Sequence, residues 1–420
     1  MNTLRSTPTP RAAATVHTVA ANDAHARVGN AAAVKAILAG SAASLVGIGL
    51  ARFAYTPLLP AMIHDQWFPA SSVASLGAAN LAGYLIGALS GRAMARYASP
   101  VMVMRLMMLL ASVSFLACAF PLSEVWFFVW RLVSGVAGGA IMVLVSGVVL
   151  HHVPVERRGI ASGAIFLGIG LGVVLSGTLV PLMQTYSLRA AWLSIGAVAL
   201  LMTLATWAAW PAQDKADTPA TLASLQRPRR LAAPVKRLLV QYGLMAVGLV
   251  PEMMFLVDYV SRGLHHGGGL GAGAWVAYGL GAMAGPLLYG MAADRFGARA
   301  AIRAALLGQV LAVLALTQAV QPALLLLIAA AIGSFPAGAV PLALARVHEL
   351  VPEAHARQAM WSRATVAFAL TQAVSGYAYS SLYGATGGHH LVLFAIGGVA
   401  FLVTFALDAR GQDPRPLAAV

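Results

Sequence analysis

Three charged side chains stand inside long apolar stretches of the sequence, where a charge needs a partner or a watery cavity. Arg52 lies in "GIGLARFAYTPLLPAMI" (47–63), Arg131 lies in a second apolar run, and Glu252 directly follows Pro251. A guanidinium at membrane depth costs roughly 2.5 to 3.5 kcal/mol on insertion scales, so such residues usually face a cavity, an ion path or an opposite charge. The arginines could therefore bind an anion, and the carboxyl group could carry a proton.

Each of these residues also has a structural alternative. Arg52 could tie two helices together through backbone carbonyls, although we favour a substrate or coupling role. Glu252 could hold a static ion pair with Arg52 or Arg131, whereas we favour proton coupling. Arg131 is a coupling candidate and equally a donor of hydrogen bonds between helices. Asp258, six residues beyond Glu252, is expected at the membrane interface.

Polar and aromatic side chains near these charges are candidate substrate contacts. Asn80 and Tyr84 share a helix face at a spacing of four residues, and Tyr55 follows Arg52 by three. Packing or an interfacial position is the ordinary role of such residues in membranes. The predicted substrate-binding set is Arg52, Tyr55, Asn80, Tyr84, Gln372 and Tyr377, with Glu252 and Arg131 as the proton-coupling pair.

The elements that must position these residues are membrane helices. Sixty percent of the 420 residues are hydrophobic, 10% are charged, and the mean hydropathy is +0.79. About 20 apolar residues suffice to cross a bilayer. Twelve spans are predicted, near 37–63, 72–94, 101–120, 124–149, 160–183, 189–210, 238–261, 271–292, 301–319, 322–345, 359–383 and 390–408. The sequence thus predicts an all-α membrane protein.

The basic residues indicate orientation rather than a nucleic-acid partner. The formal net charge is +14, yet nearly all of the 27 Lys and Arg residues fall before the first span, after the last, in alternate loops, or at the span ends next to those loops. Only Arg189 and Arg262 lie in the other loops, while Arg52 and Arg131 lie within spans. Positively charged loops stay in the cytosol. We therefore predict a multi-pass protein of the inner (plasma) membrane with both termini cytosolic and no nucleic-acid partner.

Other functional classes lack their motifs. Residues 1–35 contain no apolar signal-peptide core, so we expect a disordered cytosolic tail. Cys118 is the single cysteine, and the paired histidines (151–152, 265–266, 389–390) have no ligands beside them at metal spacing. No phosphate-binding loop and no set of nucleophile, base and oxyanion donors is present. We predict no enzyme activity, no cofactor and no metal, and a monomer.

The two halves of the chain resemble each other at an offset of 198 residues. Gly83-Tyr-Leu-Ile-Gly87 matches Gly281-Ala-Met-Ala-Gly285, and Val153-Pro154 matches Val351-Pro352. Parallel six-helix repeats with a substrate site between them describe the major facilitator architecture. The predicted domains are a tail (1–35), an N-terminal half (36–210), a basic cytosolic linker (211–237), a C-terminal half (238–408) and a second cytosolic tail (409–420).

Several motifs carry a family resemblance. "GMAADRFGAR" (290–299) resembles the loop signature of major facilitator transporters, and "RLVSGVAGG" (131–139) resembles their fourth helix. "GIGLARFAYTPLLPAM" in the first span and "GIGLGVVLSG" (168–177) in the fifth resemble the YbfB/YjiJ family of that superfamily. The resemblance implies a cytosolic latch of ion-paired residues, with ordinary positive-inside anchoring as its alternative. The latch residues would be Gly290, Asp294, Arg295, Gly297 and Arg299.

The glycines of the fifth span are expected to allow close helix packing, which a sliding interface could exploit. They are Gly168, Gly170, Gly172 and Gly177. Facilitator antiporters often carry a Gly-Pro pair in this helix, and its absence here favours symport over export.

The predicted function is transmembrane transport of a small solute by alternating access. Two arginines against one glutamate favour an organic anion, with proton coupling through Glu252. One alternative is drug or metabolite efflux by proton antiport. Another, from a different class, is a membrane receptor or scaffold that transports nothing.

Overall fold

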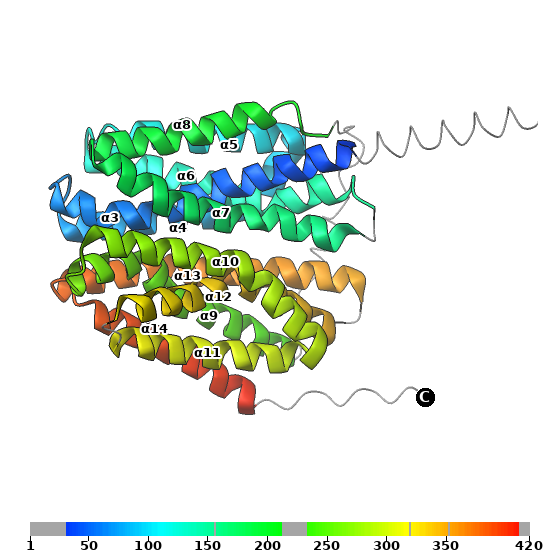
Figure 1. The fold of residues 1–420 in the computed structure, drawn as a ribbon. Coiled ribbons are helices and arrows are strands. Elements are labelled where there is room, and N and C mark those ends of the chain that lie inside the picture. The colour runs from blue at the N-terminus through cyan, green and yellow to red at the C-terminus, as the bar shows by residue number, and fades with distance from the viewer. Residues whose placement is uncertain (1–30, 155–156, 212–232, 319–320, 352, 411–420) are drawn as a thin grey trace, which may run out of the picture.

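The computed structural model describes residues 31–154, 157–211, 233–318, 321–351 and 353–410, and these contain helices and no strand. The predicted tails and most of the predicted linker (212–232) lie outside the described residues. Figure 1 shows two bundles side by side, one from each half of the chain. The described chain begins and ends at the same end of the molecule, which we name the tail end; the opposite end is the far end.

Helix 1, Ala31–His64, is interrupted in its middle. Residues 31–44 are α-helical, a π-helical segment η1 follows (Leu45–Leu50), and α2 (Ala51–Phe53) and α3 (Tyr55–His64) complete it. Pro57 and Pro60 provide no backbone N–H, so carbonyl groups four residues earlier lose their intrahelical donors. Helix 1 begins at residue 31 rather than at the expected 37, because an alanine-rich stretch extends it beyond the apolar run.

The remaining helices run alternately between the two ends. The N-terminal half continues with α4 (Ala70–Tyr97), α5 (Pro100–Cys118), α6 (Glu124–Leu150), α7 (Arg158–Gln184) and α8 (Leu188–Thr206). The C-terminal half comprises α9 (Ala233–Asp258) with the π-helical η4 (Tyr259–Gly263), then α10 (Gly267–Phe296), α11 (Ala298–Gln318), α12 (Pro322–Leu350), α13 (Ala354–Ala385) and α14 (His390–Arg410).

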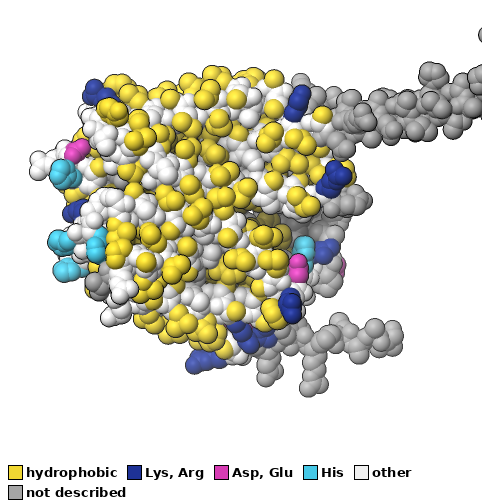
Figure 2. Space-filling view, in the orientation of Figure 1, with side chains coloured by type: hydrophobic (Ala, Val, Ile, Leu, Met, Phe, Trp, Pro, Cys, Tyr) yellow, Lys and Arg dark blue, Asp and Glu magenta, His cyan; other side chains and the backbone are white. Residues whose placement is uncertain are grey.

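Eleven helices among the described residues are long and apolar enough to cross a membrane. The twelfth is α13, whose 32 residues are more polar, and it packs lengthwise between α4 and α9. Local signals define several helix starts, because the hydroxyls of Ser99, Ser123 and Ser187 accept hydrogen bonds from the first turns of α5, α6 and α8. Apolar side chains cover the middle of the molecule, and Lys and Arg side chains lie toward its ends (Figure 2).

Two helix pairs form most of the contact between the halves, α7 with α10 and α4 with α13, and α3 of helix 1 also packs on α9. Gly170 and Gly177 of α7 lie against the α10 backbone near Met283 and Val276, where a Cβ atom would be crowded. Gly168 and Gly172, on another face of α7, lie instead against helix 1 near Ser41 and Gly49. The glycines of the fifth span therefore serve two interfaces, one within the N-terminal half and one between the halves.

Hydrogen bonds between the halves, among the described residues, lie in the middle and far parts of the helices. Thr56 Oγ1 donates to the Met253 carbonyl at 2.7 Å, and Ser380 Oγ donates to the Ala74 carbonyl at 2.9 Å. Trp275 Nε1 donates to Ser176 Oγ at 3.1 Å. These contacts close the interface between the halves at the far end.

Candidate functional site

Arg52 lies in α2, at the interruption of helix 1, and faces the C-terminal half. Its Nε donates to the Met253 sulfur at 3.3 Å, and its guanidinium lies 5.0 Å from the centre of the Tyr84 ring. The side chain is half-buried, and Nη2 has no hydrogen-bond partner among the described residues. Arg52 therefore holds a charge that aromatic faces and a sulfur offset only in part.

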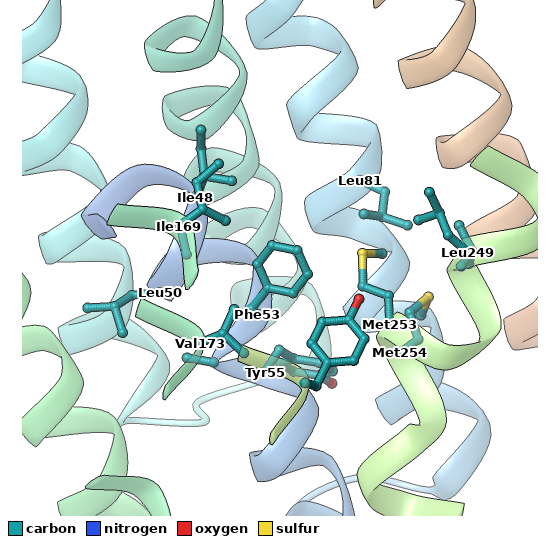
Figure 3. Packing of buried hydrophobic residues seen from close by; sticks show 14 of the residues in the cluster. Ile48, Leu50, Phe53, Tyr55, Leu81, Ile169, Val173, Leu249, Met253 and Met254 are labelled. Carbon is teal, nitrogen blue, oxygen red and sulfur yellow. The ribbon is translucent and has the colours of Figure 1, made fainter. Parts of the chain in front are cut away.

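The surroundings of Arg52 are aromatic and thioether side chains from both halves. Phe53 lies 6.2 Å from the Trp275 ring, which stacks on Tyr278 at 4.7 Å. Figure 3 shows Phe53 of helix 1 and Met253 of α9 in this shared core. The Tyr278 hydroxyl is buried without a hydrogen-bond partner in the described part of the chain. Among the described residues, the site thus offers a guanidinium with a free Nη2 and a free hydroxyl within an otherwise apolar environment.

Arg131 is bound within the N-terminal half. Its Nη1 donates to the Ala51 carbonyl at 3.0 Å, and its guanidinium lies 4.5 Å from the centre of the Tyr55 ring. The residue is only 1% exposed, and its Nε has no partner among the described residues. The geometry matches the helix-to-helix donor that we set beside the coupling role, and Arg131 supports helix 1 directly beside Arg52.

The polar side-chain atoms of Asn80 and Tyr55 also form hydrogen bonds within the protein. The Asn80 amide donates to Ser134 Oγ at 2.8 Å and lies 3.2 Å from the Ala51 carbonyl. The Tyr55 hydroxyl donates to the Val73 carbonyl at 2.5 Å. Both residues therefore tie helices 1, α4 and α6 together in this state, and their predicted role in substrate binding stays a prediction.

The remaining predicted substrate contacts are not gathered around Arg52 to the same degree. Tyr84 lies beneath the guanidinium, and its hydroxyl has no hydrogen bond among the described residues. Gln372 is buried on α13, and Tyr377 is half-buried on the same helix. Neither makes a side-chain hydrogen bond to a described residue. A surface pocket of about 330 Å³ at the far end, beside Asp65 and Arg189, lies apart from all of them.

Glu252 is buried in α9 and has no ion-pair partner among the residues that the structure describes. The side chain is 1% exposed, and neither carboxyl oxygen has a hydrogen-bond partner in the described part of the chain. Its Oε1 lies beside Gly397 of α14. No salt bridge joins it to Arg52 or Arg131, so the static pair considered above does not form in this structure. The adjacent residue, Met253, is the one that contacts Arg52.

The predicted latch residues lie at the tail end, in the last turns of α10, in the turn after it and at the start of α11. Gly297 has φ +83°, which only glycine adopts readily, and it forms the turn that ends α10. Arg299 then reaches Asp408 of α14, with Nε 3.2 Å from Oδ2 and Nη2 2.7 Å from the carbonyl oxygen. Asp294 and Arg295 are exposed, Gly290 has open space around it, and no described residue forms an ion pair with Asp294.

Sequence reasoning missed two groups of residues. Asp408 accepts hydrogen bonds from Arg299, Arg303 and Gln241, so it anchors the end of α14 to α11 and α9. Asp258, expected at the membrane interface, lies at the end of α9 and is fully buried within the protein, with three side-chain donors around it. Acidic residues near helix ends are the available signal, but their partners come from helices far away in the sequence.

Comparison with known proteins identifies the family. The family model described as "Uncharacterised MFS-type transporter YbfB" matches residues 44–409. The chain belongs to this family of major facilitator transporters. No curated protein matches the sequence. The YbfB-family assignment confirms the resemblance inferred from the first and fifth spans.

Solved structures show the same fold. The crystal structure of a D-xylose-proton symporter is 16% identical, with a TM-score of 0.68, and the alignment covers 91% of this chain and 97% of that chain. A partially occluded inward-open structure of the xylose transporter XylE from E. coli is 15% identical, with a TM-score of 0.72, covering 91% and 100%. The YbfB-family chain is therefore a multi-pass secondary transporter with the major facilitator fold, as predicted.

Proposed function

We propose that this transporter moves a small organic anion across the plasma membrane by alternating access, in symport with protons. The observation that carries the proposal is Arg52, a half-buried guanidinium without a carboxylate partner among the described residues, at the junction of the two halves. An anion between the halves would supply the missing charge, and planar carboxylates match an arginine fork.

Proton coupling through Glu252 is supported by its isolation. An ionised carboxylate buried without hydrogen bonds is costly, and a proton removes that cost. Because Glu252 is next to Met253, which contacts Arg52, movement of the Arg52 site upon binding would shift α9 directly at the carboxyl group. The D-xylose-proton symporter that shares the fold is named for such coupling, which adds support for protons as the driving ion.

The orientation that we propose places the tail end in the cytosol. Most basic residues of the described loops and helix ends lie at that end, in agreement with the positive-inside rule. The described state, closed between the halves at the far end, would then be closed toward the outside. Asp294 and the other latch residues would act at the cytosolic ends of the helices.

Flux measurements in proteoliposomes test the proposal. A panel of mono- and dicarboxylates and cationic dyes is offered with and without an inwardly directed pH gradient, and protein-free liposomes serve as the control. We expect at least one carboxylate to accumulate only with the gradient. Gradient-driven extrusion of the cationic dyes would instead favour efflux by antiport. Absence of flux for every panel member would contradict the anion proposal and favour the receptor or scaffold.

A further inference from the structure

A second group of charged side chains lies at the far end of the C-terminal half, apart from Arg52. Asp258 Oδ2 accepts hydrogen bonds from the Tyr383 hydroxyl at 2.6 Å and from His390 Nε2 at 2.7 Å. Its Oδ1 accepts from Arg262 Nη1 at 3.1 Å. We name these four residues the Asp258 cluster. The cluster joins the ends of α9, η4, α13 and α14.

His390 is positioned to add a proton to this cluster. Asp258 is fully buried, whereas the Arg262 side chain is 42% exposed, so the cluster extends from the interior to the surface. His390 Nδ1 lies beside Gly263 and has no hydrogen-bond partner among the described residues. Histidine is the side chain whose charge ordinarily changes between about pH 5 and 8. A proton taken up at Nδ1 therefore needs no rearrangement of the bond from Nε2 to Asp258.

The groups that face His390 define how its charge acts. Asp258 attracts an imidazolium and Arg262 repels it, while Tyr383 and Tyr259 are neutral, with the Tyr259 ring 5.6 Å from the His390 ring. The α10 helix packs on η4 through glycine and brings no titratable group to this contact, and α11 accepts the Tyr259 hydroxyl with a carbonyl. Only the carboxylate contacts the imidazole directly. Protonation therefore turns a hydrogen bond between a neutral imidazole and a carboxylate into an ion pair in which both partners are charged, and this strengthens the contact.

The cluster is attached to the segment that closes the two halves. Met253, five residues before Asp258 on α9, contacts both Arg52 and Thr56 of helix 1. The π-helical η4 starts directly after Asp258, and π-helical turns frequently occur at functional sites. At the 198-residue offset, helix 1 has Pro60 where α9 has Asp258, so the fold itself does not require this acid.

We propose that the Asp258 cluster is a proton-binding site at the outer face, in which a proton on His390 strengthens its bond to Asp258 and holds α9 closed against helix 1. The site differs from Glu252 in position and in the side of the membrane that it faces. It rests on the orientation proposed above and not on proton coupling at Glu252.

Thiol labelling tests the site without any substrate. Ala74→Cys places a reporter at a position that is fully buried between the halves, and the native Cys118 is buried elsewhere. Right-side-out membrane vesicles are treated with a membrane-impermeant maleimide at external pH 5.5 to 8. Tyr186→Cys, at an exposed far-end residue, corrects for the pH dependence of the reagent. We expect corrected labelling of Ala74→Cys to rise about fivefold with pH, a coupling typical of linked sites.

Two further variants isolate His390. In His390→Gln the amide keeps a hydrogen-bond donor toward Asp258 but cannot titrate, so the pH dependence should disappear. His389→Gln, at the exposed neighbour, should leave the dependence unchanged. Asp258→Asn should raise labelling at every pH; if it fails to fold, the two histidine variants still decide. Flat labelling in the parent, or a pH dependence that survives His390→Gln, overturns the proposal.

The same experiment tests the proposed orientation separately from the proposed proton site. If Tyr186→Cys resists the external reagent, the far end faces the cytosol, and the outer proton site is wrong together with the orientation. If Tyr186→Cys reacts but the Ala74→Cys signal does not depend on His390, the orientation holds and only the proton site is wrong. Neither result depends on whether Glu252 couples transport to protons.

Discussion

Replacing Arg52 with lysine separates a substrate ligand from a structural tie. Lysine keeps the positive charge but loses the planar fork that can bind a carboxylate with two parallel hydrogen bonds. In the structure Arg52 Nε donates a hydrogen bond to the Met253 sulfur, while Nη2 has no partner among the described residues. If an anion binds there, Arg52→Lys removes one of two charge-assisted bonds and leaves the attraction between the charges.

The expected loss of affinity for the anion can be estimated from that single lost hydrogen bond. A hydrogen bond to a charged group contributes about 1.5 to 3 kcal/mol, which corresponds to roughly a 10- to 150-fold loss of affinity. Weaker stacking on Tyr84 adds to the loss, since the ammonium group cannot lie flat on a ring. The structural alternative predicts a different result, because a lysine at this half-buried position could still donate to Met253 or reach water.

The assay measures initial rates of uptake in proteoliposomes over a range of concentrations of the carboxylate found in the substrate panel. We expect KM to rise at least tenfold for Arg52→Lys, as one lost charged bond requires. Arg131→Lys is the matched control, since Arg131 donates to the Ala51 carbonyl and should affect thermal stability more than KM. A KM within about twofold of the parent for Arg52→Lys would refute the binding role.

Three further substitutions test the roles of Glu252, Asp294 and Asp408. Glu252→Gln should abolish accumulation driven by a pH gradient but permit exchange without one; intact gradient-driven uptake would rule out coupling there. Asp294→Asn should lower the maximal rate without changing KM if the latch closes in another state, and an unchanged rate would leave only positive-inside anchoring. Asp408→Asn should lower the thermal unfolding midpoint, because it removes the negative charge that pairs with Arg299 and Arg303 and costs about 1 to 3 kcal/mol of unfolding free energy; an unchanged melting curve would contradict this.

The arrangement of helices could be predicted from the sequence because its determinants are local. Apolar runs give the spans and basic loops favour one orientation, and an offset that recurs across loops and helices indicates the two halves. The predicted helix ends were less accurate. Helix α9 starts at Ala233 rather than at 238, because proline is tolerated in the first turn of a helix, so that Pro234 allows the helix to begin before the apolar run. The π-helical turns depend on packing and had no signal in the sequence.

The buried residues of the candidate site could be predicted from the sequence, but their interaction partners could not. The burial of Arg52, Arg131 and Glu252 follows from their place in apolar spans. Their partners do not, because the rotation of each helix about its axis is determined by contacts with distant segments. Thus Arg131 meets the Ala51 carbonyl, and Glu252 lies beside Gly397 rather than beside an arginine. The partners of Asp258 and Asp408 depend on tertiary contacts in the same way.

Arg52 and Glu252 lie in different halves, and this limits how substrate binding and proton binding could be coupled. Arg52 belongs to the N-terminal half and Glu252 to the C-terminal half, and no salt bridge joins the two. Direct transfer between a bound anion and Glu252 is therefore not required. Because Met253 contacts Arg52 and directly follows Glu252 in the chain, an anion that draws Arg52 away would free α9 at the carboxyl group itself. Substrate and proton would then act on the position of the same helix, which is how two ligands are linked through a shared conformational equilibrium.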